Sequence, residues 1–369
     1  MKTLPRIAVC GAGRAGLSMA ADLALMGCEV NLFQIAEFKE TIEPIRHRRG
    51  IEITGETQSG KTGLGRVTLA TTDPKEAIKG VDLIIVAAPA FGHKAFFDQF
   101  SPYLEEGQNI LVSTSYWACL RFAPKLRDMG ILNKITLAEA SIMPYACTLM
   151  GPGAVHIYRT KQKDIKIAAF PAKKTDKILD VVKTIYPQHE KVPNVLWTSL
   201  GCLNTPVHAP FTIPMAGLMF DRYSGGCKFY GEATTPGARL IEAYDRERLA
   251  IAKQLGVEID SEAKAMFTLY GYKGKDLADA MRKSEHADMF CDTVFLKGLL
   301  EEDLRYFYVS LSQLGDLLGI ATPVTKGIIG ILGVMLDVNY WQGATTLDSL
   351  GLAGLNKGQI VKYVTEGEL

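Results

Sequence analysis

Three glycines near the amino terminus have the spacing of a phosphate-binding turn. Gly11, Gly13 and Gly16 form a Gly-x-Gly-x-x-Gly pattern between an apolar run at residues 6–10 and a helical pattern at 16–26. In such a turn the first glycine permits a tight bend, the second admits a pyrophosphate, and the third lets helix and strand pack closely. The N–H groups of the following helix attract phosphate. The pattern therefore predicts a dinucleotide site, with a purely structural turn as the alternative.

The residue that usually separates NAD from NADP is Gln34 in this chain. It ends the second predicted strand, where an NAD site normally presents Asp or Glu to the ribose 2′-hydroxyl. A neutral amide suits either a hydroxyl or a phosphate oxygen. Basic residues that a 2′-phosphate would attract follow at Lys39 and 46–49, although a solvated helix face is the simpler interpretation of the latter. We expect Arg14, Ala15 and Gln34 to line the cofactor site, and we leave the choice between NAD and NADP open.

Small and hydroxyl-bearing residues follow the later predicted strands. Pro89 and Ala90 come directly after the run at 83–87, and polar side chains follow at 113–115 and 139–141. Ligands of an open α/β sheet bind beyond the carboxyl ends of its strands. We therefore expect Pro89 and Ala90 beside the cofactor, and the other two segments near nicotinamide or substrate. Helix capping is the alternative role for the hydroxyls.

Hydride transfer to a carbonyl or imine needs a proton donor that titrates near neutral pH, and histidine is the usual one. Of the six histidines, three lie in charged segments and are expected in solvent: His47, His189 and His286. His156 lies in an alternating strand pattern, and His93 is near the start of the helix that follows Pro89. His208 differs because it lies in an apolar, proline-broken segment just after the predicted domain boundary. We expect it to face a cleft between two domains, with a satisfied core histidine as the alternative.

The elements that must position these residues fall into two domains. Six β-rich runs alternate with helical patterns in the first half, at 6–10, 29–33, 83–87, 109–113, 135–138 and 165–169. This alternation predicts a doubly wound parallel sheet. Helical periodicity dominates later, at 236–255, 301–318 and 326–338. The predicted fold class is α/β, with a Rossmann domain over 1–193 and a mainly α-helical substrate domain over 194–369.

Composition excludes several other classes of protein. The 369 residues carry 41 basic and 40 acidic side chains, so no nucleic-acid or membrane-surface partner is expected. No apolar stretch is long enough to span a membrane, and the first residues do not resemble a signal peptide. The seven cysteines are scattered without a Cys-x-x-Cys pair, which favours reduced thiols in the cytoplasm and no metal site.

Several segments, taken together, resemble the opine dehydrogenase family over most of the chain. They are the Gly11–Gly16 turn, the stretch from Ala138 to Cys147, Trp197–Leu200 with Asn204–Pro210, Tyr244–Gly256, Glu302–Asp303 with Val309–Pro323, and Thr346–Leu355. The glycine turn is generic, whereas the combination of the His208 and Asp303 segments is specific.

The resemblance implies a reductive condensation. An amino acid adds through its amine to a 2-oxo acid, and NAD(P)H reduces the resulting imine to a secondary amine. It also implies that His208 and Asp303 form the catalytic pair, and that Asn204, Ser141 and Cys147 lie near the substrate. Taken alone, Glu301, Glu302 and Asp303 are typical of acids at a helix N-terminus. The partners implied are therefore two small molecules, and a homodimer is the assembly we consider.

The chain departs from the family pattern where substrate is expected. Thr148 replaces the arginine that follows the cysteine in many relatives, Phe295–Gly298 replaces a His-Arg-Tyr segment, and residues 304–308 are bulkier than usual. A changed amino-acid or keto-acid pocket explains these differences most simply. Arg305 and Arg159 are candidates for clamping a substrate carboxylate.

Two other functions stay open from the sequence. One is a different two-domain NAD(P)-dependent reductase, acting on a 2-oxo acid or a glycerol phosphate, which would typically use a lysine in the second domain. The other is a dinucleotide sensor without catalysis. The presence of both His208 and Asp303 favours the opine-type reaction over the sensor.

Overall fold

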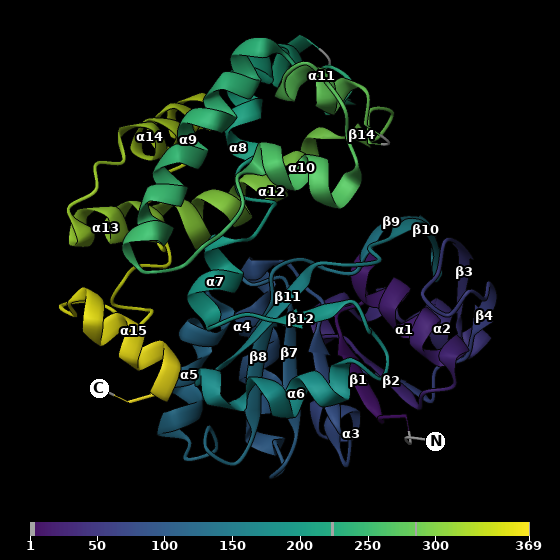
Figure 1. Cartoon of the computed structure of the whole chain (residues 1–369). Coiled ribbons are helices and arrows are strands. Elements are labelled where there is room, and N and C mark those ends of the chain that lie inside the picture. The colour runs from purple at the N-terminus through teal and green to yellow at the C-terminus, as the bar shows by residue number, and fades with distance from the viewer. Residues whose placement is uncertain (1–3, 223–224, 285, 369) are drawn as a thin grey trace. The chain divides into compact units, whose positions relative to one another are not determined.

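The computed structural model describes residues 4–222, 225–284 and 286–368 (Figure 1). Two compact units make up the chain. Unit 1 comprises Met1–Thr198 together with Lys362–Leu369, and unit 2 comprises Ser199–Val361. The change at Thr198 comes five residues after the predicted boundary at residue 193.

An eight-stranded sheet forms the centre of unit 1. In spatial order its strands are β12 (His189–Lys191), β11 (Ile165–Phe170), β8 (Thr136–Ala140), β7 (Asn109–Ser113), β6 (Leu83–Val86), β1 (Ile7–Cys10), β2 (Val30–Phe33) and β5 (Leu69–Thr71). Strands β1, β6, β7 and β8 are buried at every position. Continuous burial without alternation is typical of a parallel sheet that is covered on both faces. All six strands predicted from the sequence are present.

The sheet is not parallel throughout, contrary to the prediction. Strand β11 pairs antiparallel with β8, whereas β8, β7, β6, β1, β2 and β5 pair parallel. A parallel neighbour requires a crossover, usually through a helix. Between β8 and β11 the chain instead forms the antiparallel pair β9 (Tyr145–Gly151) and β10 (Ala154–Thr160), and it returns in the opposite direction.

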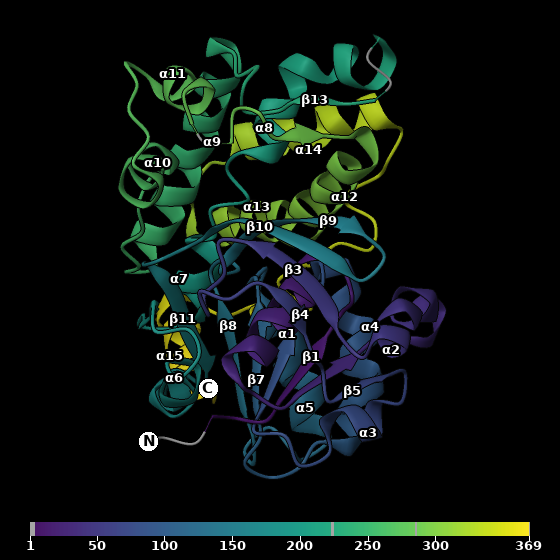
Figure 2. The same cartoon turned by 90° about the vertical axis from the view of Figure 1, so that its right-hand side faces the viewer.

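These two strands belong to a second sheet that the sequence did not predict. Its order is β4 (Gly63–Gly65), β3 (Ile51–Gly55), β10 and β9, and Figure 2 shows it beside the helix that follows the glycine turn. That helix, α1 (Arg14–Met26), contacts all four of these strands as well as β1 and β2. It is therefore enclosed between two sheets, and residues Gly16–Leu23 are buried.

The remaining helices of unit 1 are mostly short. They are η1 (Ala36–Thr41), α2 (Glu43–Arg48), α3 (Pro74–Ile78), α4 (Ala90–Phe100), η2 (Ser101–Tyr103), α5 (Ala118–Asp128), η3 (Ala172–Lys174) and α6 (Thr175–Val182). The helices α7 (Val195–Leu200) and α15 (Lys357–Glu366) contain the two points at which the chain passes between units.

The chain end belongs to unit 1, although residues 194–369 were predicted to form one domain. The Tyr363 ring lies edge-on to Phe170, with ring centroids 5.1 Å apart. The Arg127 side chain donates to the Gly367 carbonyl over 2.9 Å. Because periodicity shows only that a helix is amphipathic, it does not identify the domain that its apolar face joins.

Unit 2 is mainly helical, as predicted. Its elements are α8 (His208–Thr212), η4 (Ile213–Met215), η5 (Leu218–Arg222), α9 (Thr235–Gln254), α10 (Glu262–Tyr270), α11 (Leu277–Arg282), α12 (Thr293–Asp303), η6 (Leu304–Tyr308), α13 (Val309–Leu318) and α14 (Pro323–Leu336), with the short pair β13 (Cys227–Lys228) and β14 (Phe290–Cys291). The long helix α9 contacts α8, α10, α11, α13 and α14 and is the centre of this packing.

The predicted role of residues 301–303 at a helix N-terminus is wrong. Helix α12 ends at Asp303 and continues without a break through the π-helical turn η6 into α13. Asp303 is therefore inside a long helix, and its side chain is fully buried. A π turn widens the helix by one residue, which is common at functional sites.

The glycine turn yields a stability prediction. A Cβ atom built on Gly16 would lie 1.8 Å from the Gly11 carbonyl oxygen, whereas one on Gly13 would have no atom within 4 Å. We expect Gly16→Ala to reduce the free energy of unfolding by roughly 3 kcal/mol or more, the upper range for overpacking. Gly13→Ala should cost less than about 1 kcal/mol. Urea denaturation followed by circular dichroism measures both, and equal losses would contradict the close approach.

Candidate active site

The glycine turn has the geometry that the sequence predicts. Gly11 has a φ of +114°, and a Cβ there would lie 2.7 Å from the Ala87 carbonyl oxygen. The Gly11 N–H donates to the Phe33 carbonyl over 2.9 Å. These contacts hold the turn against the carboxyl ends of β2 and β6, where only glycine fits.

The N-terminus of α1 fits the pyrophosphate of a dinucleotide. Gly13 is its N-cap residue, and no side chain caps the helix there. Gly13 is exposed, and Arg14 and Ala15 are half-buried. The first N–H groups of a 13-residue helix with this open approach favour an anion through hydrogen bonding and the helix dipole.

The strand order places this turn at the switch point of the sheet. Strand β1 has β2 on one side and β6 on the other, so the chain connections diverge between β1 and β6. Dinucleotides bind across this point, with the adenosine ribose near the end of β2. Pro89 is exposed at the end of β6, and Ala90 is the buried first residue of α4. Both lie on the predicted edge.

Gln34 is less available than the sequence suggests. It is 6% exposed, its amide nitrogen donates to Thr41 over 3.2 Å, and its amide oxygen accepts from the Ile35 N–H over 3.0 Å. A ribose hydroxyl or phosphate would have to replace these contacts. The nearby Arg46 is exposed and bonds to Glu43 and to the Ala70 carbonyl, as expected of a solvated helix face.

Ser141 and Cys147, predicted near the substrate, lie on different segments of unit 1. Ser141 is buried, and its hydroxyl accepts from the Lys166 N–H over 3.2 Å, which gives it a structural partner. Cys147 is on β9, where its sulfur lies 3.6 Å from the Arg14 carbonyl oxygen. Burial raises the pKa of the Cys147 thiol, so it is a neutral neighbour of the glycine turn.

Lys161 follows β10 directly, and no motif in the sequence marks it. Its amine donates to the Met143 carbonyl over 3.0 Å, and burial lowers its pKa to about 8. It is close enough to Cys147 to affect the titration of that thiol. A lysine near the glycine turn, in a segment without a motif, gives no signal until the β9–β10 pair is known.

In unit 2 the structure brings His208 and Asp303 together. The Nδ1 atom of His208, at the start of α8, lies 3.0 Å from Oδ2 of Asp303 at the end of α12. His208 is 9% exposed and Asp303 is fully buried. A buried carboxylate that bonds to one ring nitrogen fixes the tautomer and orientation of the imidazole. Residues 95 positions apart thus form an acid–base pair.

Asn204 is on the same segment as His208 but not on a helix. It lies half-buried in the turn before α8, and its carbonyl accepts from the Val207 N–H over 3.3 Å. The Pro206 ring removes a backbone donor, and the helix begins only at His208.

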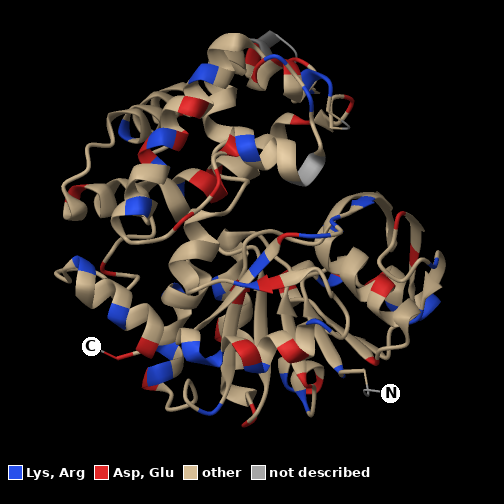
Figure 3. Cartoon of the chain, viewed as in Figure 1, with Lys and Arg blue, Asp and Glu red and all other residues tan. Residues whose placement is uncertain are grey.

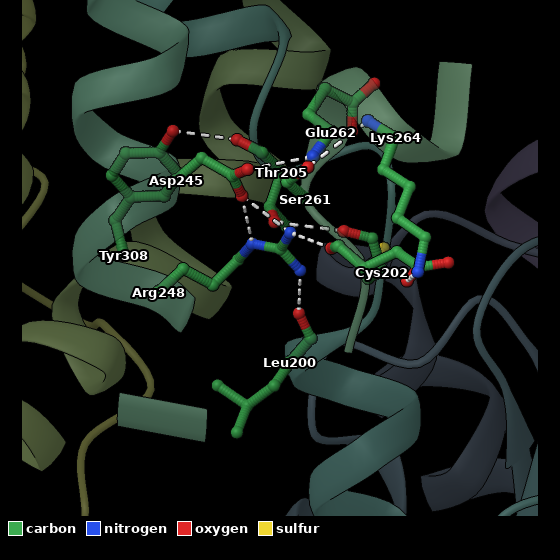
Figure 4. Close-up of polar contacts among 10 residues, drawn as sticks. Leu200, Cys202, Thr205, Asp245, Arg248, Ser261, Glu262, Lys264 and Tyr308 are labelled. Carbon is green, nitrogen blue, oxygen red and sulfur yellow. Dashed lines mark hydrogen bonds and ion pairs between the residues drawn. The ribbon is translucent and has the colours of Figure 1, made fainter. Parts of the chain in front are cut away.

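Two buried groups hold the segment 200–208 in place (Figure 4). At its start, the Arg248 side chain on α9 donates to the Leu200 carbonyl. The same guanidinium donates to the Asp245 carboxylate and to the Asp260 carbonyl. Near its end, the Tyr308 hydroxyl donates to the Thr205 carbonyl over 2.7 Å. Tyr308 is the last residue of η6, so one continuous helix supplies both this contact and Asp303.

The other histidines do not offer an equivalent acid. His93 and His189 are buried, and desolvation lowers the pKa of His93 to about 3 and that of His189 to about 4. The prediction that His189 is solvated is wrong, because it begins β12 and packs against the Tyr186 ring. His47 is exposed, as expected. His156 is on β10, 2.8 Å from the Thr54 hydroxyl, and His286 contacts the Tyr272 hydroxyl.

The two arginines predicted to clamp a substrate carboxylate, Arg305 and Arg159, differ in their surroundings. Arg305 pairs with Glu301 one turn earlier and donates to the Asn339 and Gln342 carbonyls, so it holds unit 2 together. Arg159 is exposed on β10.

A surface cavity of about 640 Å³ lies at the amino ends of the strands of the main sheet, with Asp82 and Asn109 in its wall. Because ligands of open sheets bind at the carboxyl ends, we assign no catalysis to this cavity.

Among the residues that the structure describes, no cluster of His, Cys, Asp and Glu suits a metal ion, and no helix has the length and apolarity to cross a membrane. All seven cysteines are buried free thiols. Figure 3 shows acidic and basic residues interspersed along the chain, in keeping with its net charge of +1.

The support for the His208 segment contains a pH-sensitive group. Glu262 is 2% exposed, and burial together with the Asp245 carboxylate raises its pKa from 4.5 to about 8. Between these values the folded chain keeps a proton that the unfolded chain loses, so this group makes stability fall as pH rises.

We therefore expect Glu262→Gln to become more stable than the parent as pH rises from 5 to 8, by up to about 1.4 kcal/mol per pH unit. Urea unfolding at pH 5, 6.5 and 8 measures this difference. Glu242→Gln, an exposed position on α9, should give a difference that does not change with pH. A flat difference for Glu262→Gln would show that this carboxyl is ionised in the folded chain.

Models of known protein families match parts of both halves of the chain. A family model for the alpha-helical domain of NAD/NADP octopine/nopaline dehydrogenases matches residues 191–336. A model for the N-terminus of NAD-dependent glycerol-3-phosphate dehydrogenase matches residues 6–116. Together they include the glycine turn, His208 and Asp303.

Relatives match over the full length. The opine dehydrogenase of Arthrobacter sp. (strain 1C) is 29% identical and covers 96% of this chain and 97% of its own. The vitopine synthase of Allorhizobium ampelinum is 21% identical, and the match covers 97% of this chain and 98% of that protein.

Two solved structures show the same fold. Octopine dehydrogenase with NADH and L-arginine aligns over 100% of this chain and 99% of its own, with a TM-score of 0.77 and 16% identity. Yersinopine dehydrogenase with NADP⁺ aligns over 99% and 98%, with a TM-score of 0.65 and 14% identity. This protein is an NAD(P)-dependent oxidoreductase, and its chain is similar over its full length to the opine dehydrogenases.

Proposed function

We propose that this enzyme catalyses the reversible reductive condensation of an amino acid with a 2-oxo acid, at the expense of NADH or NADPH. The amine and the keto group condense with loss of water, and the resulting imine takes up a hydride and a proton. The product is an N-(1-carboxyalkyl) amino acid. The observation that carries the proposal is the 3.0 Å contact between His208 and the buried Asp303.

His208 is the proposed acid and base. Its Nδ1 faces Asp303, so Nε2 is the nitrogen that exchanges a proton with the reactants. In condensation, His208 donates this proton to the departing hydroxyl of the carbinolamine, and the amine nitrogen loses its own proton to form the neutral imine. The Asp303 carboxylate stabilises the imidazolium form of His208 whenever it holds the extra proton.

The glycine turn and the ends of β2 and β6 are proposed to hold the dinucleotide, which supplies the hydride when bound. Gly13 leaves room for the pyrophosphate at the N-terminus of α1, while Gly11 and Gly16 permit the tight turn and the close packing behind it. Arg14 and Ala15 flank it, Gln34 lies on the adenosine side, and Pro89 and Ala90 lie on the nicotinamide side. The two bonds that occupy the Gln34 side chain favour neither NAD nor NADP.

The substrates are proposed to be two small acids. Asn204, Ser141 and Cys147 remain the proposed substrate neighbours. Among cations, Lys161 and Arg159 are stronger candidates than Arg305 for contacting a carboxylate, because Arg305 already pairs with Glu301. Thr148, in place of the usual arginine, supports a substrate pair different from that of many relatives.

Location and assembly are also proposals. Seven free thiols suit the reducing cytoplasm. A homodimer is supported by an apolar face on α14, where Ile331, Val334 and Met335 are 48%, 86% and 45% exposed. Light scattering of the purified enzyme gives the assembly directly.

A matrix of substrates tests the reaction. Amino acids paired with pyruvate, glyoxylate or 2-oxoglutarate should oxidise NADH or NADPH only when both acids are present, and the product should contain a secondary amine. Oxidation by a 2-oxo acid alone would instead indicate a simple reductase. Tight dinucleotide binding without turnover on any pair would indicate a sensor.

The His208–Asp303 pair is tested by substitution. We expect His208→Gln to lower kcat/KM by about 10²- to 10⁴-fold, the usual contribution of a general acid. Asp303→Asn should give a comparable loss, and the double variant should be little worse than His208→Gln, because the two residues act as one unit. The dissociation constant for NADH should not change. His286→Gln, in the same unit, is the matched control, and an equal loss there would remove the special role of His208.

A further inference from the structure

The backbone after β7 is strained at the edge of the sheet where the cofactor is expected. Three residues that are not glycine have positive φ angles within four positions: Thr114 at 150°, Tyr116 at 44° and Trp117 at 59°. Such conformations persist only where the surrounding structure imposes them, and they concentrate at functional sites. Tyr116 and Trp117 are buried, whereas Thr114 is half-exposed. The turn 114–117 therefore presents Thr114 at the edge of the sheet.

A buried carboxylate holds this turn from the neighbouring strand. Glu139, fully buried on β8, accepts the Cys119 N–H over 2.8 Å with one oxygen. Its other oxygen accepts the Thr198 hydroxyl over 2.6 Å. The Thr198 carbonyl in turn accepts the hydroxyl of Ser115, inside the turn, over 2.9 Å. We call Glu139, Thr198, Ser115 and the Cys119 N–H the Glu139 clamp.

The electrostatics of the clamp suit an ionised carboxylate. Cys119 is in the first turn of the 11-residue helix α5, so Glu139 lies at the positive end of that helix. A carboxylate fully removed from water is costly unless it is hydrogen-bonded, and the clamp supplies these bonds. Glu139 also raises the pKa of the adjacent Cys119 thiol, second to burial. The Cys119 thiol therefore stays protonated.

The position of the turn identifies the part of the cofactor that it meets. The adenosine ribose of a dinucleotide lies towards the end of β2, so its nicotinamide half lies on the other side of the switch point, over the ends of β6 and β7. The turn 114–117 directly follows β7. The edge residues that are not buried there are Ala88 and Pro89 after β6, and Thr114 after β7.

We infer that Glu139 is a positioning residue for the nicotinamide half of the dinucleotide, acting through Thr198 and Ser115 on the turn 114–117. This inference rests on the proposed function, because it assumes that the nicotinamide ring is the part that reacts. The clamp holds a strained turn ready before the cofactor binds. Without the clamp, the turn relaxes, and binding of the cofactor has to restore its conformation.

Binding experiments on the complete enzyme test the inference without turnover. The probes are NADH or NADPH, whichever the parent binds more tightly, and ADP-ribose or its 2′-phosphate, which lack nicotinamide. We expect Thr198→Val to weaken binding of the full dinucleotide by about tenfold, the effect of losing one hydrogen bond to a charged group. The ADP-ribose probe should change less than about twofold, well under the value of one hydrogen bond. Glu139→Gln should show the same selective loss.

Two matched variants separate positioning from folding. Thr198→Ser keeps the hydroxyl and should restore dinucleotide binding. Thr136→Val makes the same chemical change at the amino end of β8, where the buried hydroxyl has no hydrogen-bond partner, and should leave both affinities unchanged. Equal weakening of both probes by Thr198→Val, or no weakening of either, overturns the inference. Absence of turnover in the substrate matrix bears on the proposed function alone, because these affinities are measured without substrate.

Discussion

The hydrogen bond between His208 and Asp303 is the contact on which the rest of unit 2 depends. It joins two residues 95 positions apart and requires a fully buried carboxylate. Burial of a carboxyl group is costly unless hydrogen bonds replace its contacts with water. Helix α12 and its π turn fix Asp303, and they also place Tyr308 against the Thr205 carbonyl. One helix therefore orients both the carboxylate and the segment that ends in the histidine.

The support of that segment extends into a second buried network. Arg248 bonds to the Leu200 carbonyl and shares Asp245 with the Glu262 backbone. Its guanidinium has five donors in a rigid plane, so it can join three chain segments at once. Burial, and after it the neighbouring Asp245 carboxylate, raises the pKa of Glu262. The segment that carries His208 is thus held by fixed polar groups as well as by apolar packing.

In unit 1, close backbone contacts as well as a buried carboxyl group hold the segments at the edge of the sheet. The close approach of Gly16 to Gly11, and of Gly11 to Ala87, fixes the turn that precedes α1. At the far side of the switch point, the strained turn after β7 depends on a buried carboxylate on β8. In both units a buried acidic side chain from a neighbouring element bonds to the segment for which we propose a function. Asp303 and Glu139 each bond to residues that are far away in the sequence.

Local patterns in the sequence were sufficient for the glycine turn, six strands of the main sheet and the helical second half, because each is set by residues within a few positions. The resemblance to opine dehydrogenases paired His208 with Asp303 before any contact was known. Tertiary structure alone decided the antiparallel return of β11, the second sheet, the burial of His189 and the attachment of Tyr363 to unit 1. It also revealed the buried side chains of Glu139 and Arg248 and the half-buried amine of Lys161. All of these features depend on contacts between residues far apart in the sequence. Desolvation, which shifts the pKa of a buried group, cannot be deduced from the neighbouring residues in the sequence.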